Sequence, residues 1–377
     1  MDLSALAIDG LVPSRAETPA SAEEVASLVS AAHRDRAAAV IFGGGTRISV
    51  GDAPSRYDVA IDMRGVRGVV EHSPSDLVCM VRAGTTLADL ATALGRHGQR
   101  WPVDVPEPER ATVGGTIASA ATGPSRLRHQ HVRDWVIGCE AVLGDGTRVR
   151  AGGRVVKNVT GYDLTRLYSG SFGTLAVLVE LSLKLVAIDE RAQVLSLRGD
   201  AGTLASLGKT LRATLPLDGL VLATGDAAGG GAALTVRVAG ARAAVDRVTR
   251  EIRARGAFAE TEDAAWHTLV SLPARTDRVA RAAVPPGSES EVLGGSAVAH
   301  IGTGSAFLFG ERSNGKISAL RGRCEAIGGA LILERTSSEQ RRALGTWGTQ
   351  RVPAAIARSL KERFDPRGVL APGRLPV

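Results

Sequence analysis

The residues best suited to chemistry in this sequence are a glycine run and its neighbours: Gly43, Gly44, Gly45, Thr46 and Arg47. Glycine loses more backbone freedom on folding than other residues, so such a run indicates that the backbone does something a side chain would block. The alternatives are a plain turn, a phosphate cradle or a close approach to a flat ligand. A Walker loop would need Lys after the last glycine, and a Rossmann fingerprint would need GxGxxG opening a helix. What remains is a loop whose successive amides point at an anion, with Arg47 nearby.

Two further stretches are rich in small residues. TVGGTIASAATG begins at Thr112, and GSFG covers residues 170–173. A helix of Gly, Ala, Ser and Thr either makes a tight helix–helix contact or lies against something large and flat, and its residues alone leave both readings open. GSFG is either an ordinary loop or part of the same ligand site.

The composition describes a globular chain of 377 residues, with 44% hydrophobic and 23% charged residues. Only 3% of the residues are aromatic, which argues against a surface that stacks nucleic-acid bases. The net charge of +7 comes from scattered Arg residues interleaved with acids. This pattern fits either a solvated surface or a field that attracts an acidic partner or substrate.

The cysteines exclude one class of site. Cys79, Cys139 and Cys324 are far apart and form no CxxC pair, so the sequence predicts no metal or iron–sulfur site held by this chain alone. Sparse cysteine use suits a reducing cytoplasm. We expect no signal peptide, because the start lacks a basic region, and no membrane span, because the longest apolar run contains Glu180 and Lys184.

The periodicity predicts an α+β chain with a boundary near Ile188. Before it, helices capped by Ser21 and Thr86 alternate with strands, and a Gly-Asp-Gly hairpin precedes a long buried strand. After it, two strand–helix–strand–strand rounds suggest a duplicated α+β module beside one sheet. We therefore expect domains at 1–188 and 189–340, with segment 341–377 packing back on the first.

The order of the motifs carries a family resemblance. GGGT is followed by VRAGTTLADL, WPVDVPEP, ATVGGTIASAATG, VRDWVIGCEAVLGDG, KNVTGYDL, GSFGTLAVLVELSLKL and FDPRGVLAPGR. In this order the chain resembles the FAD-binding family of vanillyl-alcohol oxidase and p-cresol methylhydroxylase (the PCMH type), and within it the glycolate oxidase FAD-binding subunits, the E type. The resemblance is strong from about Thr18 to Ile188, extends over the tail, and holds only in outline between them.

The resemblance implies a PCMH-type domain of two α+β lobes holding FAD, and a smaller α+β cap domain with an antiparallel sheet. FAD is expected to be non-covalent, because Thr46 stands after the nest where no His or Cys is available for attachment. The implied FAD-binding residues are Gly43, Gly44, Gly45, Thr46, Arg47, Thr112, Val113, Gly114, Gly115, Ile117, Ala118, Gly170, Ser171, Gly173, Val177 and Val179.

Several positions leave alternatives open. One alternative is that a group near the flavin stabilises negative charge on the reduced ring, with the candidates Lys157, Asn158, Tyr162 and Asp163. The other is that Lys157 and Asp163 form a weak ion pair at the surface. The sequence departs from the family pattern at three places, each of which either perturbs the cofactor fit or is neutral drift: Gln130-His131, Ala176 and Ala371.

No catalytic residue can be assigned from the sequence. Relatives that oxidise 2-hydroxy acids carry a His-rich strand with a DGN-like motif, and the nearest stretch here is AHIGTGSAFLFG, where we interpret His300 as a core or edge histidine. His129, His131 and His267 have no patterned acid partner, and no Ser-His-Asp triad is suggested.

Three functions follow as hypotheses. The first is the FAD-binding subunit of a glycolate oxidase-like complex that oxidises a 2-hydroxy acid and passes electrons to a second flavin subunit and an iron–sulfur subunit. Such a protein would be cytoplasmic and reach the inner face of the membrane only through partners. The second is a self-sufficient FAD oxidase or dehydrogenase, and the third is a cofactor-free binding protein.

Overall fold

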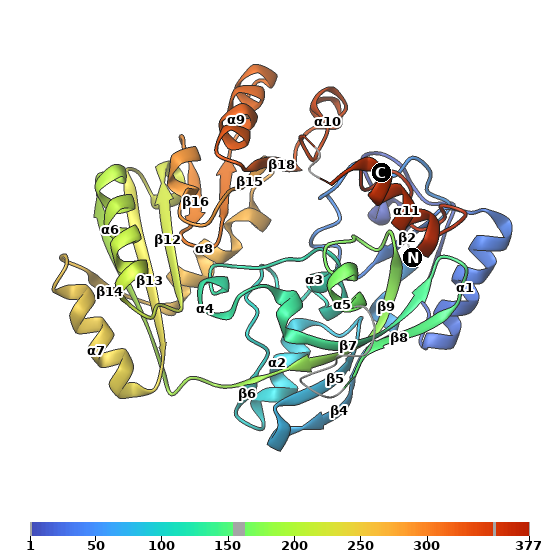
Figure 1. The fold of residues 1–377 in the computed structure, drawn as a ribbon, viewed down its shortest axis with the longest axis horizontal. Helices are drawn as coiled ribbons and strands as arrows, with labels where there is room; N and C mark the ends of the chain where they lie inside the picture. Colours follow the sequence, from blue (N-terminus) through green and yellow to red (C-terminus); the bar gives the residue numbers. More distant parts are fainter. Residues whose placement is uncertain (1, 154–162, 350–351, 377) are drawn as a thin grey trace.

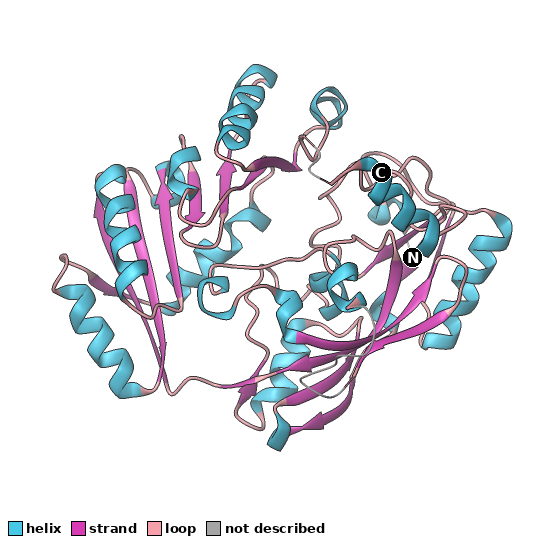
Figure 2. Cartoon of the chain, in the orientation of Figure 1, coloured by secondary structure: helices cyan, strands magenta, loops and turns pink. Residues whose placement is uncertain are grey.

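The protein, seen here in a computed structural model, is described for residues 2–153, 163–349 and 352–376. An eight-stranded sheet with its helices stands on one side of Figure 1, and two smaller sheets stand on the other, with the termini beside them. Figure 2 shows that loops rather than long helices join the two sides. No helix in the described ranges is long and apolar enough to cross a membrane.

The first lobe is a small parallel sheet covered by one helix. Its strands, in spatial order, are β1 (Arg15–Glu17), β3 (Val59–Asp62) and β2 (Ala39–Phe42). Helix α1 (Ala22–Asp35) begins at Ser21, whose side chain accepts a hydrogen bond from the amide of Glu24 at 3.2 Å. Its buried face, with Val25 and Val29, packs over the sheet.

The C-terminal segment lies against this first sheet. The amide of Ala39 donates to the carbonyl of Val369, and the amide of Ala371 donates to the carbonyl of Ala39, both at 2.8 Å. Helix α11 (Ala354–Phe364) precedes it. No helix was predicted in segment 341–377, so α11 is an element that the sequence reasoning missed.

The second lobe is a five-stranded antiparallel sheet. Its strands, in spatial order, are β4 (Val69–Ser73), β5 (Val78–Arg82), β9 (Ala176–Lys184), β7 (Val136–Leu143) and β8 (Arg148–Gly152). Its helices are α2 (Leu87–Gly95), α3 (Val113–Ala118) and α5 (Leu164–Tyr168). The predicted hairpin is confirmed as β7–β8, which turns through Gly146 at φ +90°. The predicted long buried strand is β9.

A short antiparallel pair and one short helix stand where the chain leaves this lobe. Strand β10 (Val186–Ala187) pairs with β6 (Gln99–Arg100), and α4 (Arg126–His129) faces the large sheet. The chain then enters that sheet at β11.

The large sheet, which we call the cap sheet, is antiparallel throughout. Its strands, in spatial order, are β14 (Ala259–Thr261), β11 (Arg191–Gly199), β13 (Ala232–Gly240), β12 (Gly219–Thr224), β16 (Ala297–His300), β17 (Ser305–Phe309), β15 (Val279–Ala283) and β18 (Ala330–Arg335). Numbered within each half, the order reads 4-1-3-2 and then 2-3-1-4, so two similar units meet at β12 and β16. The predicted duplication is confirmed.

Helices cover both faces of the cap sheet. One face packs against α6 (Ala201–Thr214), α7 (Arg242–Arg253) and α9 (Asn314–Ala326) through a single apolar cluster. The other face packs against α8 (Asp263–Arg275), whose Trp266 is almost fully buried. Helices α8 and α10 (Ser338–Leu344) were not predicted.

One backbone position next to α4 is strained. Gln130 follows the helix with φ 63° and ψ −154°, a conformation that is essentially restricted to glycine. Its amide donates to the carbonyl of Arg126 at 2.9 Å, and this hydrogen bond helps to hold the residue there. This is one of the positions where the sequence departs from the family pattern.

Replacing Gln130 by Gly is therefore expected to raise the free energy of unfolding by about 1 kcal/mol, since relief of strain exceeds the entropy cost of a glycine. Gln130→Ala keeps the Cβ and should leave stability within about 0.5 kcal/mol. Urea denaturation of the three proteins measures the difference. Equal stabilisation by both variants would show that the side chain, and not the backbone, is the cause.

Candidate functional site

The glycine loop after β2 lies in close contact with the segment that leads into α3. A Cβ added at Gly44 would overlap the carbonyl oxygen of Arg110, and one at Gly43 would overlap the hydroxyl of Thr112. The missing side chains therefore let two stretches of backbone touch. This gives both glycines a packing reason that the sequence alone did not show.

The next residues of the loop have amides without hydrogen-bond partners among the described residues. Gly45 has φ +72°, and a Cβ placed there would meet nothing closer than the Arg110 Nη2 atom at 3.9 Å. In the described part of the chain the amides of Gly44, Gly45 and Thr46 donate no hydrogen bond. Adjacent unpaired amides of this kind can bind an anion.

Helix α3 presents an open face and a packed face. Thr112 caps it by accepting from the amide of Gly115 at 3.2 Å, and Gly115 itself is exposed. Gly114 is buried, and a Cβ there would lie 2.7 Å from that of Ala83. The small residues of α3 thus serve tight packing on one side and leave the other side clear.

The GSFG turn is hydrogen-bonded to the end of α3. The amide of Gly170 donates to the carbonyl of Ile117 at 3.1 Å, and that of Phe172 donates to the carbonyl of Ala118 at 2.8 Å. Three segments that are far apart in the sequence therefore meet: the glycine loop, α3 and the GSFG turn. We call the space between them the crevice.

Two small cavities, of about 60 and 30 Å³, mark the crevice. The first is lined by the predicted residues Gly43, Thr112, Gly114, Gly115, Ala118, Gly173 and Val177, and the second by Thr46 and Arg47. The other predicted residues lie beside these cavities or in the core, without lining either cavity: Gly44, Gly45, Val113, Ile117, Gly170, Ser171 and Val179.

One predicted group falls mostly outside the description of the structure. Lys157, Asn158 and Tyr162 lie outside the described residues. Asp163 is described: it caps α5 and forms an ion pair with Arg166 at 2.9 Å. It therefore has a structural partner within its own helix.

Two residues at the crevice were missed from the sequence. The Nη2 atom of Arg110 donates to the carbonyl of Gly44 at 3.2 Å, and its Nη1 atom pairs with Glu107 at 2.6 Å, so a paired guanidinium lies beside the loop. Phe172 lines the first cavity at φ 53°, with its ring 5.4 Å from that of Trp347. The signals were present, since Arg110 directly precedes ATVGG and Phe172 is the only large residue of GSFG.

The predicted cation Arg47 is engaged with the cap sheet. Its guanidinium makes two hydrogen bonds of 2.9 Å to Glu334 on β18, and Glu334 also accepts from Arg281 on β15 at 2.6 Å. Burial alone would raise the pKa of Glu334, but the two arginines outweigh burial and hold the pKa below its ordinary value. This triad joins the first lobe to the cap sheet and carries a net positive charge.

A second cationic group lies near the same junction. The Arg126 guanidinium donates to Nε2 of His131. Burial and then the charge of Arg126 lower the pKa of His131 to about 4, so its imidazole is neutral at pH 7. His300 on β16 is almost fully buried, and burial with Arg126 lowers its pKa to about 3. Its Nε2 has no hydrogen-bond partner among the described residues.

The remaining histidines have partners that the sequence did not suggest. Nε2 of His129 lies 3.4 Å from the buried Asp218, and His267 lies 3.8 Å from Asp263 on the exposed side of α8. Within the described ranges no group of three or more His, Cys, Asp or Glu side chains could hold a metal ion.

The fold and the crevice define a class of protein. Residues 13–152 match the FAD binding domain family. The whole fold resembles p-cresol methylhydroxylase, with a TM-score of 0.70, 15% identity, and coverage of 95% of this chain and 88% of that one. Alkyldihydroxyacetonephosphate synthase gives a TM-score of 0.73 at 18% identity, covering 95% of this chain and 76% of that one. Residues 13–152 are thus similar to an FAD binding domain, and the chain as a whole has the fold of p-cresol methylhydroxylase.

Two proteins that are similar in sequence are also similar to each other in the kind of substrate that their names give. The chain is 36% identical over 196 residues to glycolate oxidase subunit GlcE of Escherichia coli, which covers 51% of this chain and 55% of that protein. It is also 36% identical over 167 residues to a D-lactate dehydrogenase of Archaeoglobus fulgidus, covering 44% and 37%. The matches thus span about half of this chain and about half or less of each relative.

The residues present fit FAD at the crevice. Unpaired amides of the glycine loop and the charge of Arg110 suit a pyrophosphate, and the exposed Gly115 leaves room beside α3 for a flat ring. The two cavities are far smaller than a dinucleotide.

Removal of the Glu334 charge should weaken the junction between the first lobe and the cap sheet. Glu334→Gln is expected to lower the free energy of unfolding by about 3 kcal/mol, because it leaves two partly buried arginines without their shared partner. Glu17→Gln, which removes an exposed pair with Arg15, should cost less than about 1 kcal/mol. Urea denaturation at pH 7 compares them, and equal costs would contradict the role given to Glu334.

The ion pairs of Glu334 also make the stability of the protein depend on pH. Because the folded-state pKa of Glu334 lies below its ordinary value of 4.5, its stabilisation is present above that value and is lost as pH falls through the folded-state pKa. The difference in stability between the wild type and Glu334→Gln should therefore shrink in acid. A difference that stays constant down to the lowest pH at which both proteins fold would contradict this account.

Proposed function

We propose that this chain is the FAD-binding subunit of a glycolate oxidase-like complex, which oxidises a 2-hydroxy acid and passes the electrons to partner chains. The observation that carries the proposal is the meeting of the glycine loop, α3 and the GSFG turn at one crevice. The likeness to a glycolate oxidase subunit supports the choice of substrate class.

FAD bound here would accept the hydride, with its two electrons, that leaves the alcohol carbon. In the proposal the amides of Gly44, Gly45 and Thr46, together with Arg110, hold the pyrophosphate, and the clear face of α3 positions the ring. Phe172 and Trp347 restrict access of water to the crevice. FAD is held without a covalent bond.

The proposal assigns no catalytic base to this chain. Glu334 is held by two arginines, and His131 accepts from Arg126. His300 is buried in the sheet beside Phe307, with the two rings 5.2 Å apart. In the proposal a base for the hydroxyl proton comes from a partner, a second flavin subunit accompanied by an iron–sulfur subunit.

The test is to purify the chain alone and together with the chains encoded by neighbouring genes. The chain alone should be yellow, should release FAD on acid precipitation, and should not reduce a dye with glycolate; the complex should do so. Glycolate turnover by the isolated chain at the rate of the complex would instead establish a self-sufficient dehydrogenase. A colourless chain that added FAD does not rescue would contradict cofactor binding.

The second candidate, a self-sufficient dehydrogenase, is favoured by one observation. The chain is also similar to a D-lactate dehydrogenase, although over only 37% of that protein. Anaerobic addition of a panel of 2-hydroxy acids to the isolated chain separates the candidates, because only a self-sufficient enzyme would bleach its own flavin.

A further inference from the structure

A large cavity of the described structure lies apart from the crevice. It measures about 820 Å³ and shares no lining residue with the two cavities of the crevice. One wall is α4 of the FAD-binding domain; the others are the loop after α6, the junction of β13 with α7, and the turn between β16 and β17. Its volume is within the usual range for small-molecule sites.

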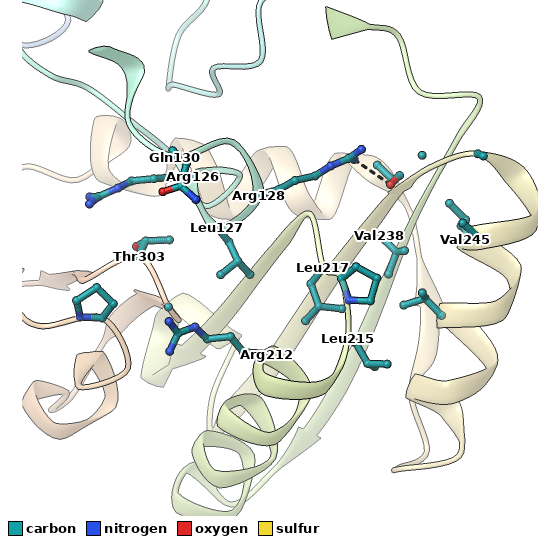
Figure 3. A pocket seen from close by; sticks show the side chains of 18 of the residues that line it. Arg126, Leu127, Arg128, Gln130, Arg212, Leu215, Leu217, Val238, Val245 and Thr303 are labelled. Atoms are coloured by element: carbon teal, nitrogen blue, oxygen red, sulfur yellow. Dashed lines mark hydrogen bonds between the residues drawn. The ribbon is translucent and has the colours of Figure 1, made fainter. Parts of the chain in front are cut away.

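The two halves of this cavity differ in chemistry. Figure 3 shows Arg126, Gln130, Thr303 and Arg212 toward one end, and Leu215, Leu217, Val238 and Val245 toward the other. No Asp or Glu is among the described residues that line it. The cavity therefore offers positive charge at one end and apolar surface at the other.

Two arginines, Arg212 and Arg126, supply the positive charge at this end of the cavity. Among the described residues Arg212 makes no ion pair and no hydrogen bond, and it is exposed. It passes across Gly302, where an added Cβ would lie 2.5 Å from Nε of Arg212 and 2.8 Å from a methyl carbon of Leu127. The absence of a side chain at Gly302 thus allows the guanidinium to lie over the turn between β16 and β17.

Arg126 is the oriented cation of the pair. Its guanidinium donates to the neutral His131, so its charge is positioned but not neutralised by that contact. Burial, and then the charges of Arg281 and Arg133, lower the pKa of Arg126 to about 10. A guanidinium that is partly desolvated among other cations gains from a nearby anion.

The strained backbone of Gln130 borders the same cavity. This residue keeps a conformation restricted to glycine while its side chain faces the cationic end. Strain of this kind concentrates at ligand sites, because the surrounding structure must maintain it. It is a second feature of this wall, independent of the cavity volume.

We infer that this cavity binds a small carboxylate with an apolar body, with the carboxylate between Arg126 and Arg212 and the hydrocarbon against the exposed Pro216 and Ala244. Arg128 does not take part, because it donates to the carbonyl of Ala239 at 2.9 Å and lies within ion-pair distance of Asp189. The inference concerns binding only. It does not depend on the proposed function.

The test uses hexanoate as the probe on the FAD-loaded chain, with binding followed by calorimetry. Acetate supplies the charge without the apolar body, and 1-hexanol supplies the body without the charge. Hexanoate should bind saturably. Acetate and 1-hexanol should each bind at least about tenfold more weakly than hexanoate. A lack of saturable hexanoate binding overturns the inference.

Matched variants locate the site. Arg212→Gln should weaken hexanoate about tenfold through loss of a charge-assisted hydrogen bond. Lys209→Gln removes a charge from the same helix, outside the cavity, and should change nothing. Equal weakening by both variants would indicate general attraction to a positive surface and would overturn the inference.

A second pair of variants tests the apolar end. Ala244 is exposed and lines the cavity, whereas its exposed neighbour Ala243 does not. Ala244→Phe should fill the apolar end and abolish hexanoate binding, and Ala243→Phe should leave it intact. Undiminished binding in Ala244→Phe would overturn the placement of the hydrocarbon.

Discussion

The structure of the crevice depends on one steric constraint, the contact between the backbone at Gly43–Gly44 and the backbone and cap at Arg110–Thr112. A side chain at Gly44 would occupy the position of the Arg110 carbonyl. Because the two backbones touch, the loop after β2 lies beside the start of α3, and the amides of the next residues have no hydrogen-bond partner among the described residues. The third segment follows from this arrangement, since the GSFG turn is hydrogen-bonded to the end of α3.

Electrostatics then join this domain to the cap sheet. Arg47, which the sequence placed near the anion, instead shares Glu334 with Arg281 across the junction. The glycine loop therefore has two roles: its amides face the crevice, and the residue that follows Thr46 anchors the cap. A ligand that changes the position of this loop would also act on the contact between lobe and cap, which is a physical route from the crevice to the second domain.

Much of this arrangement could be predicted from the sequence, and the rest could not, for identifiable reasons. Periodicity and turn residues revealed the hairpin through Gly146, the long strand β9 and the duplicated cap module. Helix α8 was missed although Trp266, Val270 and Pro273 recur at helical spacing, because a proline inside a segment argues against a helix. Helix α11 was missed because no residue of it is buried. The partners of Arg47 and His129 lie 287 and about 90 residues away, and no local pattern encodes such contacts. The strain at Gln130 was equally invisible, since only backbone angles reveal it.

The most direct test of the central claim is calorimetric titration of FAD into apoprotein carrying Gly44→Ala or the control Gly315→Ala. Gly315 lies in α9 with nothing within 4 Å of an added Cβ, so its variant should bind FAD as the wild type does. Gly44→Ala should bind FAD more than about tenfold more weakly, because the added methyl group pushes the loop away from Arg110 and disperses its amides. A folded Gly44→Ala protein that binds FAD with wild-type affinity would contradict the account.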